Sequence, residues 1–80
     1  MPKLKNLSGI NVVMIFSLFG FDIASQKGSH IKLRRNKNNF KQTLTIPNHK
    51  ELDKGTLKAI FRQASRYISE EELFNHFYDL

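Results

Sequence analysis

A chain of 80 residues with a net charge of +6 and no cysteine fits only a few classes of protein. The length suits one small domain, so we expect residues 1–80 to fold around a single core. Without cysteine there is no disulfide framework and no thiolate metal site, and the three histidines lack metal-ligand spacing. We therefore expect a cytoplasmic protein that uses no metal and no other cofactor.

The positive charge is concentrated in the middle of the chain. Ten lysines and arginines lie between His30 and Arg66, where the only acidic residues are Glu51 and Asp53. From Tyr67 onward the balance reverses, with four acidic residues and no lysine or arginine. We expect the basic middle to bind a polyanion, and nucleic acid is a better candidate than acidic lipid.

The uncharged run at residues 7–21 is expected to form the first helix. As a secretory signal it would lead to a poor cleavage site, Asp22-Ile23-Ala24, and it is too short and too polar to span a membrane. Ser8 is a good N-cap and Gly20 a suitable end, which predicts a helix over residues 9–19. Its main apolar face carries Val12, Val13, Phe16 and Phe19.

A second apolar stripe follows the same helix at intervals of four residues. It consists of Ile10, Met14 and Leu18, at positions where a surface helix usually carries polar side chains. Two explanations remain open at this point. Another element of the chain covers the stripe, or the stripe is a partner-binding surface.

Three short strands are expected to follow and to pair in an antiparallel sheet. Residues 21–25 alternate, with Phe21, Ile23 and Ser25 on one side, and a glycine turn at residues 27–29 comes next. In the second strand Ile31 and Leu33 face one way, and the other face carries His30, Lys32 and Arg34. The third strand covers residues 41–46 and ends at Pro47.

A hairpin with a loop at residues 36–39 would join the second and third strands. The predicted pairs are Arg34 with Lys41, Lys32 with Thr43, and His30 with Thr45. Leu44 and Ile46 then point into the core. The exposed face presents His30, three cations and two threonine hydroxyls, which suit phosphate oxygens, but it has no aromatic side chain on which bases could stack.

Two more helices complete an α+β pattern of α-β-β-β-α and a short C-terminal helix, with the helices on one face of the sheet. Asp53 is the predicted N-cap of a helix over residues 54–65, whose buried face carries Leu57, Ile60, Phe61 and Ala64. Its row of cations, Lys54, Lys58 and Arg62, either meets an anion or is simply solvated. Ser69 and Glu72 predict a capping box at the start of the last helix.

His30 is the residue best suited to catalysis. Cleavage of RNA without a metal needs a base for the ribose 2′-hydroxyl, cations for the charge on the phosphorane, and an acid for the leaving oxygen. A neutral His30 can be the base, whereas the acid remains open between Lys27, Ser29 and a second histidine. The predicted RNA-binding residues are Lys27, Gly28, Ser29, Lys32, Arg34, Lys41, Lys54, Lys58 and Arg62. A non-catalytic RNA-binding or partner-binding module on the same fold remains the alternative.

In order along the chain, several short segments together resemble the HicA family, the toxins of type II toxin–antitoxin pairs. The likeness runs from Ser8 to about Phe74. Its landmarks are Ser8-Gly9, Gly20-Phe21, Gln26-Lys27-Gly28-Ser29-His30, Thr45-Ile46-Pro47, Lys54-Gly55-Thr56-Leu57, Ile60 and Gln63-Ala64. Many members carry a second polar or histidine residue after the motif histidine, where this chain has Ile31.

The resemblance implies a fold like that of a double-stranded-RNA-binding domain. It also implies an mRNA interferase, an endoribonuclease that blocks translation by cutting mRNA, with His30 as the matching catalytic histidine. The implied partner is a HicB-like antitoxin that covers the active site. DNA would then be bound only indirectly, through the antitoxin in the complex.

Overall fold

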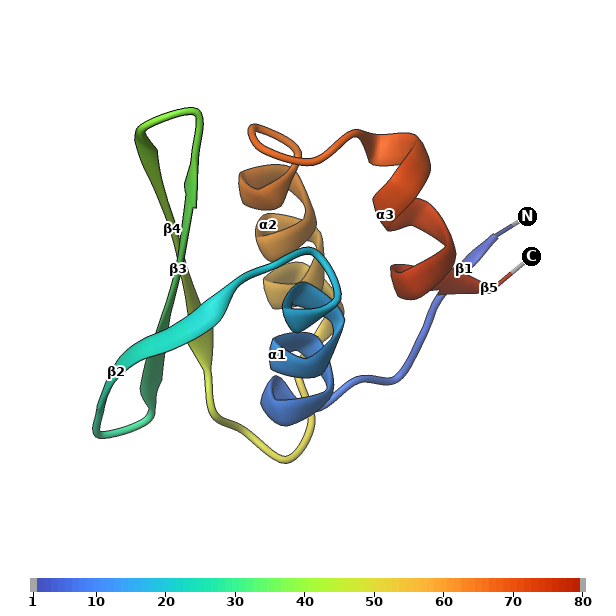
Figure 1. Ribbon diagram of the computed structural model, residues 1–80. Coiled ribbons are helices and arrows are strands. Elements are labelled where there is room, and N and C mark those ends of the chain that lie inside the picture. The colour runs from blue at the N-terminus through green and yellow to red at the C-terminus, as the bar shows by residue number, and fades with distance from the viewer. Residues whose placement is uncertain (1, 80) are drawn as a thin grey trace.

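The computed structural model describes residues 2–79, and these form an α+β fold in which helices cover one face of an antiparallel sheet (Figure 1). The three-stranded sheet, in the order β2-β3-β4, stands on one side of the molecule. Helices α1 and α2 pack beside it, and α3 lies on their far side (Figure 1). The predicted fold class is confirmed.

The elements follow the expected order, with one short strand added at each end. They are β1 (Lys3–Leu4), α1 (Gly9–Ser17), β2 (Asp22–Lys27), β3 (His30–Lys37), β4 (Phe40–Pro47), α2 (Lys54–Ala64), α3 (Glu70–Phe77) and β5 (Tyr78–Asp79). Strands β1 and β5 pair with each other and bring the two ends of the chain together (Figure 1). Within residues 2–79, no helix is long and apolar enough to cross a membrane.

The core is built by one face of the sheet and the inner faces of all three helices. Its buried members are Val12, Phe16, Phe21, Ile31, Leu33, Leu44, Ile46, Leu52, Leu57, Ile60, Ala64, Ile68, Leu73 and Phe77. The predicted inner faces of the first two helices are therefore confirmed at their central positions, while Val13, Phe19 and Phe61 are half-buried.

Helix α1 begins as predicted and ends two residues earlier than predicted. The Ser8 hydroxyl accepts a hydrogen bond from the Asn11 N–H at 3.0 Å, and the Asn11 carboxamide accepts one from the Ser8 N–H at 3.0 Å, which makes a reciprocal capping box. Leu18 is the C-cap, and Gly20 has a φ of +91° in the turn that leads to β2. Glycine adopts this conformation without the strain that a side chain would cause.

The hairpin between β3 and β4 is tighter than the predicted four-residue loop. Asn38 and Asn39 both have positive φ, 54° and 66°, so they form the two-residue turn that asparagine favours. The observed partners are Arg34 with Thr43, Lys32 with Thr45, and His30 with Pro47. The predicted register was therefore wrong by two residues, but a shift of two keeps every side chain on its predicted face.

Strand β2 does not keep the simple alternation that the sequence predicts. Its register with β3 shifts between Ile23 and Ser25, so Ile23 pairs with the inward-facing Leu33 while Ser25 pairs with the outward-facing Lys32. Ile23 and Ser25 therefore lie on opposite faces, because a β-bulge places an extra residue between them.

Both C-terminal helices start at their predicted N-caps. The Asp53 carboxylate accepts from the Thr56 N–H at 2.8 Å, and α2 ends at Ala64 with Ser65 as its C-cap. At α3 the Ser69 hydroxyl accepts from the Glu72 N–H, but the Glu72 carboxylate accepts from the Ser69 hydroxyl at 3.2 Å. Only the serine half of the predicted capping box is therefore present there.

Candidate active site

His30 opens the central strand of the sheet, on the face that the helices leave uncovered. It is exposed, whereas its neighbour Ile31 is buried in the core. Its cross-strand partners are Lys27 on β2 and Pro47 on β4. Paired Cα atoms in an antiparallel sheet lie about 4.5–5.5 Å apart, so a lysine side chain and the imidazole begin within reach of one phosphate group.

The turn before His30 is fixed by backbone contacts. Gly28 has a φ of +59°, and the Ser29 carbonyl oxygen accepts a hydrogen bond from the Asn48 N–H at 2.6 Å. Asn48 in turn lies against the start of α1. The contact is so close that a Cβ added to Gly9 would overlap the Pro47 carbonyl oxygen and come within 3.0 Å of the Asn48 Cα. The position of His30 therefore depends on a close contact between α1 and the end of β4.

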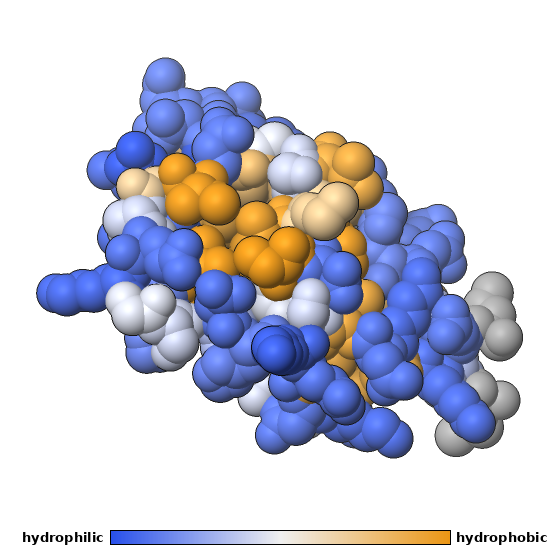
Figure 2. All heavy atoms as spheres, turned by 90° about the horizontal axis from the view of Figure 1, so that it is seen from below, coloured by the Kyte–Doolittle hydropathy of each residue, from blue (hydrophilic) through white to orange (hydrophobic). Residues whose placement is uncertain are grey.

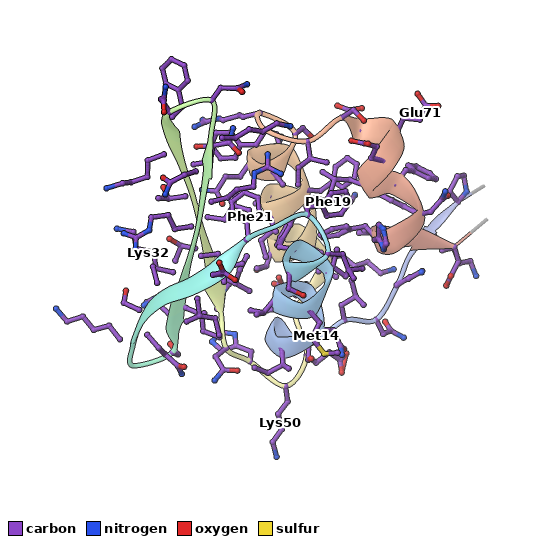
Figure 3. All side chains as sticks on the ribbon, viewed as in Figure 1. Met14, Phe19, Phe21, Lys32, Lys50 and Glu71 are labelled. Atoms are coloured by element: carbon purple, nitrogen blue, oxygen red, sulfur yellow. The ribbon has the colours of Figure 1, made fainter. Side chains whose placement is uncertain are left out.

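The cations predicted to surround His30 are spread along the outer face of the sheet. Lys32 and Arg34 are exposed two and four residues further along β3, and Lys32 points away from the helices (Figure 3). Lys41 pairs with Asn36, six residues from His30 on β3, which corresponds to a separation of roughly 20 Å along the strand. Lys27 and Lys32 are thus grouped with His30, whereas Lys41 lies toward the hairpin tip.

The row of cations on α2 borders two different depressions. Lys54 and Lys58 line a depression next to Lys3, Leu4 and Tyr78, beside the ladder of β1 and β5. Arg62 instead lines a groove against β4, together with Arg66. The terminal ladder beside the two lysines was not predicted by any pattern in the sequence, whereas the contact of Arg62 with the groove lies on the side of β4.

The groove between β4 and α2 has a volume of about 410 Å³. It is lined by Thr45, Pro47, Thr56, Ala59, Ile60, Arg62, Gln63 and Arg66. Pro47 is the cross-strand partner of His30, so the groove begins one strand away from the histidine. Arg66 was not among the predicted site residues, and it lies two residues beyond the end of α2, in the segment that leads to α3.

Arg35 belongs to the framework of the fold. Its guanidinium donates to the Gln42 side chain at 2.8 Å, to the Phe19 carbonyl oxygen at 2.7 Å and to the Tyr67 carbonyl oxygen at 3.2 Å. It also lies 4.7 Å from the centre of the Phe21 ring. This residue therefore joins the end of α1 to the segment between α2 and α3, and it does not contribute to the exposed cationic face.

The second apolar stripe of α1 is exposed. Ile10, Met14 and Leu18 have exposed fractions of 49%, 62% and 72%, so no element within residues 2–79 covers them. Ile23, at the edge of the sheet, is 56% exposed. Figure 2 shows hydrophobic side chains gathered in one patch on this side of the molecule. The first explanation for the stripe, cover by another element, is therefore wrong for the described part of the chain.

Two further titratable side chains, His76 and Asp53, have contacts within the fold. The His76 ring packs edge-on against Phe19, with ring centres 5.5 Å apart, which gives it a structural role. Hydrogen bonds from Thr56 lower the pKa of Asp53 below its ordinary value. Among residues 2–79, no three histidine, cysteine or acidic side chains lie close enough together to hold a metal ion.

The comparison with protein families gives one match. The model described as the HicA toxin of bacterial toxin–antitoxin matches residues 11–65, more than two thirds of the chain. Comparisons with curated proteins and with solved structures gave no match. The matched segment contains most of α1, the whole three-stranded sheet with His30, and α2. The chain therefore belongs to the HicA family of toxins, whose members act in toxin–antitoxin systems and are paired with an antitoxin.

Proposed function

We propose that this toxin is an endoribonuclease that cuts mRNA, without a metal ion, and thereby inhibits translation. The observation that carries the proposal is the position of His30. It is the exposed first residue of a central strand, next to Lys27 across the sheet, on the face opposite the core. A histidine held on a rigid element among cations has what general-base catalysis on a phosphodiester needs.

The reaction follows from these side chains. Neutral His30 takes the proton from a ribose 2′-hydroxyl, and the 2′-oxygen attacks the adjacent phosphorus. The bond from phosphorus to the 5′-oxygen of the next nucleotide breaks, which leaves a 2′,3′-cyclic phosphate and a 5′-hydroxyl. Lys27 and Lys32 offset the charge on the phosphorane. We assign the proton on the leaving oxygen to Lys27, because its Cα is paired with that of His30.

Expression in bacteria tests this proposal. The parent chain is expected to arrest growth and to leave cut mRNA, whereas the His30→Ala variant should do neither, because a general base is worth about 10²–10⁴ in rate. His49→Ala is the matched control, since His49 is a second exposed histidine on the β4–α2 connection, and it should arrest growth like the parent. A variant without His30 that is as toxic as the parent would support the non-catalytic module instead.

We further propose that a HicB-like antitoxin binds the exposed stripe of Ile10, Met14 and Leu18. Family membership implies an antitoxin, and the three side chains of the stripe are large, apolar and exposed at intervals of four residues along α1. Side chains of this kind each contribute roughly 1.5–3 kcal/mol when they are buried.

The double change Met14→Glu and Leu18→Glu tests this interface. It is expected to weaken antitoxin binding by roughly 100-fold or more, because two apolar contacts are replaced by desolvated carboxylates. RNA cleavage by the free toxin should stay unchanged. Phe40→Glu is the control, since Phe40 is an exposed apolar side chain at the hairpin tip, outside the stripe. An equal weakening of antitoxin binding in the control would contradict the assignment.

A further inference from the structure

We propose that the groove between β4 and α2 is a subsite for the nucleotide next to the cleaved phosphate, with Arg62 and Arg66 holding that nucleotide's own phosphate. This inference rests on the proposed function, because it takes His30 as the point where the RNA chain is cut. It adds a second, separate contact region for the same RNA strand.

The first argument is continuity with His30. Lys27, His30 and Pro47 are partners in one line across the three strands, and Pro47 is also a wall of the groove. Pro47 and Thr45 are paired with His30 and Lys32 and lie on the same face of the sheet. The alternate residues of β4, Leu44 and Ile46, are buried on the opposite face. The Cα atoms of His30 and Pro47 are about 5 Å apart. An RNA strand that crosses β3 at His30 therefore enters the groove within one nucleotide.

The second argument is the chemistry of the lining. Two guanidinium groups line the groove, and no carboxylate from the described residues does. The hydroxyls of Thr45 and Thr56 and the carboxamide of Gln63 can hydrogen-bond to a ribose or a base edge. The remaining wall is apolar, formed by Pro47, Ala59 and Ile60. Charge, hydrogen-bonding groups and apolar surface thus match the phosphate, sugar and base of one nucleotide.

The third argument is that the two arginines are available. Both are exposed, and neither takes part in a side-chain hydrogen bond within residues 2–79. Arg35, by contrast, donates to three partners in the fold. Arg62 lies in α2 and Arg66 just beyond its end, and guanidinium groups of this kind can bind a phosphate with several parallel donors.

The size of the groove points to single-stranded RNA. About 410 Å³ lies in the range of roughly 300–1,000 Å³ that is typical of pockets for one small ligand. A nucleotide can enter such a groove only when it is unstacked from its neighbours, and single strands and loops offer such nucleotides, whereas an A-form duplex does not. The substrate class that fits is therefore an unpaired segment of mRNA.

The test measures binding in the His30→Ala background, so that the RNA stays intact. The probe is a ten-nucleotide single-stranded RNA of mixed sequence, and its Kd is measured as a function of salt concentration. Changing both Arg62 and Arg66 to Gln is expected to weaken binding at low salt by at least tenfold. It should also reduce the slope of log Kd against log salt by about 0.7 for each phosphate that the variant no longer neutralises.

The matched control changes Lys3 and Lys50 to Gln, which removes the same charge from two exposed lysines that do not line the groove. It should leave the salt slope within error of the parent, and all variants should keep the parent's melting temperature. An equal decrease of the slope in the control, or unchanged RNA binding together with weakened antitoxin binding in the arginine variant, would overturn the subsite. The proposed function itself is tested by a different measurement, cleavage of RNA by the parent chain. If the parent shows no cleavage that depends on His30, the proposed function fails whatever the arginine variant shows.

Discussion

Gly9 shows how a single residue controls the position of the candidate active site. It is buried where α1 meets the end of β4, and it leaves no room for a Cβ beside the Pro47 carbonyl. Pro47 and Asn48 in turn hold His30 and Ser29 in place through strand pairing and a hydrogen bond. The serine–glycine pair at the start of α1 therefore has a packing role in addition to capping the helix.

Gly9→Ala is accordingly expected to destabilise the protein by about 1–3 kcal/mol, the usual cost of forcing extra volume into a packed contact. Urea denaturation measures the free energy of unfolding. Gly55→Ala is the control, since it also replaces a helical glycine but nothing lies within 4 Å of the added Cβ. It should stabilise the protein by about 0.4–1 kcal/mol. Similar effects of the two changes would refute the role given to Gly9.

Arg34 and Arg35 are neighbours in sequence with opposite functions. Arg34 is exposed on the outer face, whereas the guanidinium of Arg35 donates to Gln42, Phe19 and Tyr67. A lysine ammonium cannot reproduce this planar set of donors. Arg35→Lys is therefore expected to cost about 1.5–3 kcal/mol of unfolding free energy, and Arg34→Lys less than about 0.5 kcal/mol. Thermal and urea unfolding of the two variants provide the comparison, and equal decreases in stability would contradict it.

At the scale of whole elements, the Asp53 carboxylate at the start of α2 makes the stability of the fold depend on pH. Two hydrogen bonds from Thr56 lower the pKa of Asp53 below 3.8 in the folded state. Because the folded pKa lies below the unfolded one, this stabilisation is complete above 3.8 and is lost as pH falls through the folded value. The cap therefore acts at neutral pH and fails in acid.

Asp53→Ala is expected to lower the melting temperature at pH 7, and the difference from the parent should shrink as pH falls below 3.8. Ser8→Ala removes the uncharged cap of α1 and serves as the control. Its difference from the parent should persist over the same pH range, because a hydroxyl does not titrate there. A constant deficit for the Asp53 variant would show that its carboxylate charge is unimportant.

Elements with a strong local signal were predictable from sequence. The caps at Ser8, Asp53 and Ser69 and the apolar spacing behind them correctly predicted where all three helices begin. The hairpin register was not predictable, because it depends on whether Asn38 and Asn39 alone form the turn. Strands β1 and β5 have two residues each, which is too few for a periodic pattern. Each is a strand only through its pairing with the other, and the two are far apart in sequence.

The surfaces of the whole molecule were only partly predictable, for a related reason. The face of His30 follows from the alternation of one strand, so a shift of two residues in its partner did not affect it. The groove that Arg62 and Arg66 share with Thr45 depends on how α2 packs against β4, which no local pattern in the sequence contains. The exposed stripe of Ile10, Met14 and Leu18 was visible in the sequence, but only the fold shows that nothing among residues 2–79 covers it.

The whole molecule thus presents two surfaces of different chemistry. The outer face of the sheet carries His30 and cations, and the exposed side of α1 is apolar. We assign the first to RNA and the second to the antitoxin. Because the surfaces are separate, substitutions at Met14 and Leu18 should change antitoxin affinity without changing catalysis, whereas substitution of His30 should remove catalysis and leave the apolar contact between α1 and the antitoxin in place.

Cleavage of single-stranded RNA by purified protein in EDTA tests the central claim most directly. The parent is expected to cut and to leave 2′,3′-cyclic phosphate ends. His30→Ala should bind the same RNA with an unchanged Kd and cut it about 10²–10⁴ times more slowly. Cleavage by His30→Ala at the parent's rate, or no cleavage by the parent until a divalent metal is added, would contradict the assignment of His30 as the general base of a metal-independent ribonuclease.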